Sequence, residues 1–172
     1  AVDDRLRLVF TCCHPALAPE SRTALTLRMV CGLTTDEIAR AFLVPEPTMA
    51  ARITRAKKKV ATARIPYRVP ADEELPERLD GVLTVIHLAF TAGHTSPGPE
   101  LVRADLVARA LDLARVLAVL MPDEPEVLGL LALLELTDSR RAARVDAEGR
   151  LVLLEDQDRS LWDPDALARG DA

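Results

Sequence analysis

Residues 33–59 constrain the fold more than any other part of the sequence. Thr34 is followed three residues later by Glu37, a spacing that predicts a capping box and therefore a helix that begins at Thr34. Pro45 and Pro47 cannot lie inside a helix but suit its first turn, so they predict the start of a second helix. Two helices joined by a short turn in this way form a helix-turn-helix.

The second helix, over residues 46–64, is predicted to be amphipathic. Its apolar side chains recur at helical spacing and should share one face. They are Met49, Ile53, Ala56, Val60 and Ala63. The other faces carry the basic residues Arg52, Arg55, Lys57, Lys58 and Lys59. We therefore expect a helix that packs along one edge and presents cations along the others.

The charge is distributed unevenly along the chain. The net charge of the 172 residues is −5, but residues 1–70 hold 12 basic and 6 acidic residues, a net charge of +6. Residues 71–172 hold 10 basic and 21 acidic residues, a net charge of −11. Because salt screens charges beyond roughly 8–10 Å, a local basic patch can attract an anion on an acidic protein. The charge pattern thus permits nucleic-acid binding by the first half.

The composition favours an all-α protein with one large domain or two small ones. Apolar residues make up 49% and aromatic residues 3%, and Gly is scarce. Cys12, Cys13 and Cys31 are an odd number without a secretory signal, which predicts free thiols in a reducing compartment. No apolar run approaches the roughly 20 residues that cross a bilayer, so we expect a cytoplasmic protein without membrane contact.

Helices are also predicted outside the helix-turn-helix. Residues 3–13 and 19–31 should form two helices that complete a compact four-helix unit ending near Arg64, with Gly32 in the left-handed position after the second. The proline-rich residues 64–76 should form an extended linker. Helices over 75–90 and 101–121 follow, separated by a loop at 93–99.

The last third of the chain is predicted to contain a leucine-rich helix, a small β-hairpin and a short final helix. A leucine-rich helix should run to Leu136, with Asp123 and Glu126 as its capping box, and it is apolar nearly all round. Residues 144–155 suggest a small β-hairpin, and a short helix should start near Pro164. Arg109 and Asp112 could pair on the surface. The predicted domains are 1–66, a linker at 67–76, and a helical extension at 77–172.

Several short sequence segments in the first half of the chain resemble those of a known protein family. They are LTLR at 25–28, GLT at 32–34, EIA at 37–39 and TMAARITRAK at 48–57. This combination resembles region 4 of sigma-70-type transcription factors, specifically the extracytoplasmic-function group, over residues 1–66. FTCCHP at 10–15, IPYRVP at 65–70 and the words between 145 and 160 resemble a subgroup with a long helical C-terminal extension. In that subgroup a sigma region 2, which opens the promoter, precedes region 4. These residues contain no such segment, so we expect a fragment of a longer protein.

The resemblance implies that the chain reads the −35 promoter element and docks on the β flap of RNA polymerase core. Arg52 and Arg55 are assigned to bases or adjacent phosphates, and the three lysines to phosphates. Ala50 and Ala51 stand where relatives carry longer polar residues, and alanine can contact only a thymine methyl. The candidate DNA-binding residues are Thr34, Thr35, Thr48, Ala50, Ala51, Arg52, Thr54, Arg55, Lys57, Lys58 and Lys59.

Simpler structural roles account for other groups of polar residues in the sequence. Cys12, Cys13, His14 and Cys31 lack a C-x-x-C spacing, so buried thiols are favoured over a metal site. His87, Thr91 and His94 could line a pocket, but partly buried polar residues are the simpler interpretation. The acids of 155–163 lack the spacing of a calcium loop. With no phosphate loop or nucleophile motif, we expect neither an enzyme nor a cofactor.

The extension has two competing interpretations. The charge of −11 over residues 71–172 suggests that this part of the chain masks residues 52–59 until a signal displaces it. Its leucine-rich helix suggests instead a scaffold that contacts polymerase, an anti-sigma or other regulatory protein, or a second copy of the chain. A stand-alone helix-turn-helix regulator with a ligand-sensing or dimerising C-terminal domain is the alternative function. Such a regulator would bind a palindromic site as a dimer.

Overall fold

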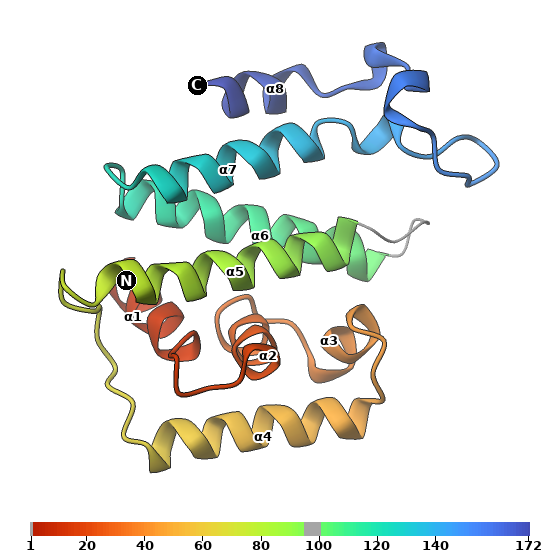
Figure 1. Ribbon diagram of the computed structural model, residues 1–172. Helices are drawn as coiled ribbons and strands as arrows, with labels where there is room; N and C mark the ends of the chain where they lie inside the picture. Colours follow the sequence, from red (N-terminus) through yellow and green to blue (C-terminus); the bar gives the residue numbers. More distant parts are fainter. Residues whose placement is uncertain (1, 95–100) are drawn as a thin grey trace. The chain divides into compact units, whose positions relative to one another are not determined.

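The computed structural model describes residues 2–94 and 101–172 (Figure 1). It forms two compact units, Ala1–Ala89 and Phe90–Ala172. The regular elements of the described residues are all helical, which confirms the predicted all-α class. Residues 95–99 of the predicted loop lie outside the described residues, and the predicted domain division stays a prediction.

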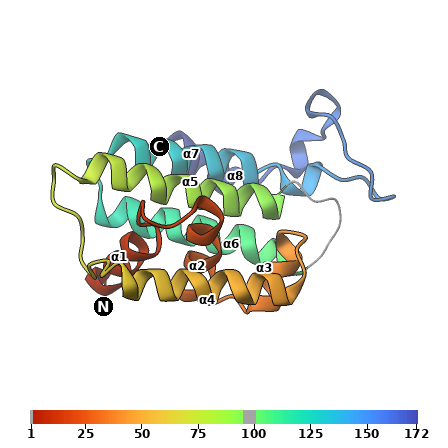
Figure 2. The ribbon, with the colours of Figure 1, turned by 60° about the horizontal axis from the view of Figure 1, so that its bottom comes forward.

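The first unit contains α1 (Val2–Cys12), α2 (Pro19–Met29), α3 (Thr35–Ala41) and α4 (Glu46–Thr62), close to the four predicted helices. α4 packs along α2 and α3 (Figure 2). The predicted capping box is confirmed: the Thr34 amide donates to Glu37 Oε2 at 2.6 Å, and the Glu37 amide donates to Thr34 Oγ1 at 3.2 Å. These bonds fix the start of α3 because they satisfy two otherwise open amides.

The turn between α3 and α4 depends on backbone bonds rather than on a side-chain cap. Leu43 adopts a φ of 55°, and the Val44 amide donates to the Ala39 carbonyl at 3.0 Å. Pro45 then precedes α4 without a side-chain cap bond, so proline alone starts the helix by its fixed φ. The turn thus sets the direction of α4 with little help from side chains.

The helix α5 (Leu75–His94) contributes its first four turns to the first unit. Arg78 is 7% exposed, and its Nη2 donates to the Phe10 carbonyl at 2.7 Å. A Cβ at Gly81 would lie 3.2 Å from the Cys13 carbonyl oxygen, so the helix backbone approaches the end of α1 closely. Val82 and Ile86 are buried one turn apart. The compact unit therefore continues to Ala89, past the four helices that the sequence predicts as one unit.

The second unit contains α6 (Leu101–Leu120), α7 (Pro125–Asp138) and α8 (Pro164–Asp171), with short 3-10 turns η1 (Arg141–Ala143), η2 (Leu154–Asp156) and η3 (Arg159–Leu161). α7 packs against both α6 and α8 (Figure 1).

The predicted capping box of Asp123 and Glu126 at the start of α7 is wrong. Because Pro125 occupies the first helical position, Glu124 becomes the N-cap, and it makes no side-chain cap bond.

The predicted β-hairpin is also wrong. Across residues 2–94 and 101–172 the structure has no strand, and only one isolated antiparallel bridge joins Val145 to Leu151. The turn itself forms, because the Asp146 carboxylate accepts the amides of Glu148 and Arg150 at 3.0 and 2.8 Å. Leu151 is 59% exposed, so the two arms bury too little apolar surface to extend the pairing.

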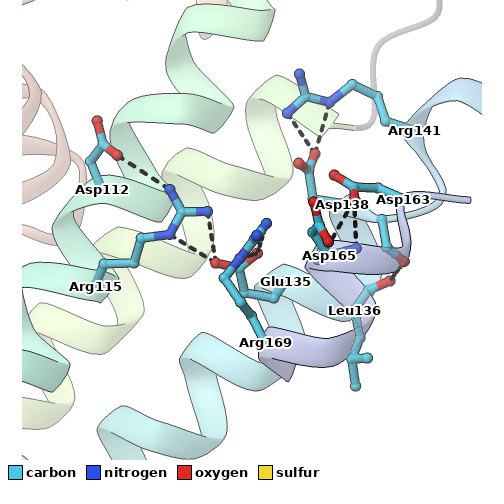
Figure 3. Close-up of polar contacts among 11 residues, drawn as sticks. Asp112, Arg115, Glu135, Leu136, Asp138, Arg141, Asp163, Asp165 and Arg169 are labelled. Carbon is cyan, nitrogen blue, oxygen red and sulfur yellow. Dashed lines mark hydrogen bonds and ion pairs between the residues drawn. The ribbon is translucent and has the colours of Figure 1, made fainter. Parts of the chain in front are cut away.

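A buried carboxylate joins the three helices of the second unit (Figure 3). Glu135 on α7 is 2% exposed. Its Oε1 accepts from Arg115 Nε of α6 at 2.8 Å, and its Oε2 accepts from Arg169 Nε of α8 at 3.2 Å.

The predicted pairing of Arg109 with Asp112 is wrong. Arg109 pairs with Asp105 and Asp112 with Arg115, so each acid lies N-terminal to its arginine, the favourable order on a helix.

The end of α5 carries a histidine that should make the second unit sensitive to acid. The His94 ring stacks on Phe90 with centroids 5.0 Å apart, and burial lowers the pKa of His94 to about 4, helped by Arg144, Arg141 and Arg140. The unfolded chain binds this proton at its ordinary pKa of about 6.5. His94 therefore supports folding fully above pH 6.5, and this support is lost as the pH falls toward 4.

We expect unfolding by urea at pH 7.5 and pH 5.0 to show this loss in the wild type. The variant His94→Gln, which cannot take up the proton, should lose less stability over the same interval. The comparison removes the contribution of carboxylates, which titrate in both proteins. Equal losses in the two proteins would show that His94 does not carry the effect.

Candidate nucleic-acid interface

The helix α4 buries one face and exposes the rest. Met49, Ile53 and Ala56 are 1%, 5% and 2% exposed, as the apolar spacing predicts. Val60 is only half-buried, and Ala63 is exposed because α4 ends at Thr62. The buried edge is therefore shorter than predicted, but it anchors the helix to α2 and α3 over its first three turns.

The cations of α4 face away from this buried edge. Arg55, Lys57, Lys58 and Lys59 are exposed and Arg52 is half-buried. None of the five forms an ion pair with an acid among residues 4–94 and 104–172, in contrast with Arg40 of α3, which pairs with Asp36 at 2.6 Å. Because their charge is not neutralised by neighbouring carboxylates, these side chains are available to an external anion.

The uncharged candidate residues flank the cations. Thr48, Ala50, Ala51 and Thr54 are exposed on α4, so each can reach a ligand lying along the helix. Thr35 is half-buried at the start of α3. The hydroxyl oxygen of Thr34 accepts the Glu37 amide, which leaves its proton as the group that can bond outward. The structure thus places the candidates from Thr48 to Lys59 together on α4. Thr34 and Thr35 lie at the start of the neighbouring helix, α3.

A cleft borders the cationic side of α4, and the sequence did not predict it. Arg52, Arg55 and Lys59 line one wall, and the segment at 16–21, which enters α2, lines the other. Its volume is about 480 Å³, and Glu20 is the acid among its lining residues. The only signal in the sequence is the shared helical face of 52, 55 and 59, since the second wall depends on how α2 packs against α4.

Comparison with known families decides the identity of this unit. Residues 7–60, which include all of α4's cations, match the family described as sigma-70, region 4. Residues 78–172 match a family of unknown function, DUF6596, over more than half of the chain. The chain belongs to DUF6596 and carries a sigma-70 region 4 domain. The residues of α3 and α4 described above are therefore the helix-turn-helix of region 4.

One curated relative is an uncharacterized protein of Rhizobium meliloti (strain 1021), 53% identical over 161 residues. The match covers 93% of this chain and 38% of the relative, so the chain spans well under half of that protein's length. No solved structure matches the chain. Among the described residues, no helix is both long and apolar enough to cross a membrane.

The three thiols lie in the core of the region 4 domain. Cys12, Cys13 and Cys31 are buried thiols that form no disulfide with one another, as predicted. Burial raises the pKa of Cys12 and of Cys13 to about 12, and Cys13 Sγ lies 3.3 Å from Thr26 Oγ1. His14 accepts the Ala16 amide at its Nδ1. Thiols held in the neutral form are poor nucleophiles and poor metal ligands, so Cys12 and Cys13 serve packing.

Proposed function

We propose that the chain binds promoter DNA as the region 4 part of an extracytoplasmic-function sigma factor. The observation that carries this proposal is the row of cations on α4 without acidic partners among the described residues. DNA binding by proteins depends largely on neutralising phosphates with such side chains. The sigma-70 region 4 match supports the same conclusion.

The dimensions of α4 suit the major groove. A helix of 17 residues is roughly 26 Å long, so its first two turns can lie against base edges while its later turns meet the backbone. Arg52 and Arg55 are the proposed base contacts, with Thr48, Ala50, Ala51 and Thr54 beside them. Lys57, Lys58 and Lys59 are the proposed phosphate contacts. Thr34 and Thr35 add hydroxyl donors from α3. Together these contacts would read the −35 element.

Protein contacts are proposed for the same chain. A region 4 domain implies contact with RNA polymerase core, and we propose the β flap as its docking site. In the extension, Leu128, Leu133 and Leu136 of α7 are 45%, 51% and 39% exposed, which supports an interface with an anti-sigma protein or a second copy. The net charge of −11 over residues 71–172 supports equally well the interpretation that this part masks residues 52–59.

Selection of duplexes from a random pool separates the two candidate functions. A sigma region 4 should enrich one short asymmetric element bound by a single copy. A dimeric helix-turn-helix regulator should enrich two half-sites related by a palindrome. Enrichment of a palindrome would replace the sigma assignment by the regulator, and no enrichment at physiological salt would contradict both.

A further inference from the structure

The first unit contains a second hollow, which DNA contact does not explain. It lies where α2, the α3–α4 turn, α4 and α5 meet, and its volume is about 300 Å³. The lining residues are Pro19, Glu20, Thr23, Ala24, Phe42, Met49, Arg52 and Leu88. We call it the α5 pocket, because Leu88 of α5 closes one side. A duplex has no apolar body of a size to enter such a space.

The walls of the α5 pocket are mostly apolar. Phe42, Met49 and Leu88 supply large apolar side chains, and Pro19 and Ala24 supply small ones. The hydroxyl of Thr23 already donates to the Pro19 carbonyl at 3.2 Å, so it does not require a ligand. Specificity for a polar group must therefore come from the charged residues in the lining, Arg52 and Glu20.

Arg52 and Glu20 also line the cleft beside α4, so the α5 pocket and the cleft meet at these two residues. Arg55 and Lys59 lie in the cleft as well, which gives the shared region three cations against one carboxylate. Arg52 forms no ion pair with an acid of the described residues. An apolar pocket that opens on an unneutralised guanidinium favours a ligand with an apolar body and an anionic head.

We infer that the α5 pocket binds an amphipathic carboxylate, with its hydrocarbon part among Phe42, Met49 and Leu88 and its carboxylate at Arg52. A volume of about 300 Å³ lies at the small end of ligand sites, which favours a medium-chain or single-ring acid. The consequence for DNA rests on the proposed function: a ligand that occupies Arg52 removes one base contact, so it lowers DNA affinity.

Methyl NMR on the intact chain tests binding without any variant. The three methionines are Met29, Met49 and Met121, and Met49 alone of the three lines the α5 pocket. We expect octanoate, titrated below its micelle-forming concentration, to shift the Met49 methyl signal and leave the other two in place. Octanol, which lacks the charge, should bind at least tenfold more weakly. An unmoved Met49 signal, equal shifts at all three methionines, or equal binding of octanol overturns the inference.

Leu88→Trp fills the α5 pocket from a position outside the proposed DNA contacts. Leu88 is 42% exposed, so the larger side chain can be accommodated. We expect this variant to bind octanoate at least tenfold more weakly, whereas the matched control Val119→Trp, at a 78% exposed site, should bind it like the wild type. Unchanged binding by Leu88→Trp contradicts the assigned pocket.

Measurements of DNA binding in the presence of octanoate distinguish a failure of this inference from a failure of the proposed function. Octanoate should weaken DNA binding several-fold in the wild type and in Val119→Trp, but not in Leu88→Trp. If the chain binds octanoate as described and no duplex at all, the proposed function fails while the pocket assignment stands. If DNA binds normally and octanoate moves no methionine, the pocket assignment alone fails.

Discussion

Replacing Lys57, Lys58 and Lys59 together by glutamine is expected to lower affinity for every duplex by about 100-fold at 0.15 M salt. Each phosphate contact contributes roughly 0.9 to the slope of log affinity against log salt, so three lost contacts flatten the slope by about 2.7. Fluorescence anisotropy with a labelled duplex at several salt concentrations measures both quantities. The loss should be similar on selected and on unrelated sequences, because phosphates carry no sequence information.

Two further variants test whether the loss of affinity is specific to the three lysines of α4. Replacing Arg109, Arg141 and Arg159 by glutamine removes the same charge from exposed positions of the second unit and should leave the slope nearly unchanged. Replacing Arg52 and Arg55 by glutamine should mainly reduce discrimination between selected and unrelated duplexes, by about 1–3 kcal/mol for each bidentate base contact. A normal slope in the triple-lysine variant would refute the phosphate assignment.

Removing both arginines that face Glu135 is expected to be the most destabilising change in the second unit. The double variant Arg115→Gln/Arg169→Gln leaves the Glu135 carboxylate, 2% exposed, without a cationic partner. An uncompensated buried carboxylate costs about 3–5 kcal/mol. The free energy of unfolding from urea denaturation, followed by circular dichroism, should fall by about this amount.

The charge itself should be the cause, and a third substitution tests this. Adding Glu135→Gln to the double variant removes the buried charge and should restore much of the lost stability. Arg109→Gln, which breaks the exposed pair of Arg109 with Asp105, should cost less than about 1 kcal/mol. If Glu135→Gln does not rescue the double variant, the loss comes from packing of the arginine side chains instead.

Local features of the sequence predicted the start of α3 and most of the buried face of α4. The Thr34 to Glu37 spacing fixes the start of α3, and the spacing of Met49, Ile53 and Ala56 fixes the buried face of α4. Both depend on contacts within a few residues. The hairpin prediction failed because a pair of short arms also needs a surface to pack on, and the exposure of Leu151 shows that the folded unit supplies too little.

Features that join distant segments could not be predicted. The buried bond from Arg78 to the Phe10 carbonyl crosses 68 positions and brings α5 into the first unit. The Glu135 network joins three helices, and nothing near Glu135 in the sequence marks it as buried among leucines. The cleft beside α4 and the α5 pocket likewise depend on how α2 and α5 pack against α4. Helical periodicity predicts which face of a helix is buried, but it does not predict which segment of the chain packs against that face.

DNA recognition by α4 is tested most directly by locating the DNA on the protein. A photo-crosslinking amino acid at Thr54, exposed on α4 and free of any proposed core role, should form crosslinks to the selected duplex. The same residue at Val119, 78% exposed in the second unit, serves as the reference. We predict at least tenfold more crosslinked DNA from position 54 than from position 119. Equal yields, or none from position 54, would contradict DNA recognition by α4.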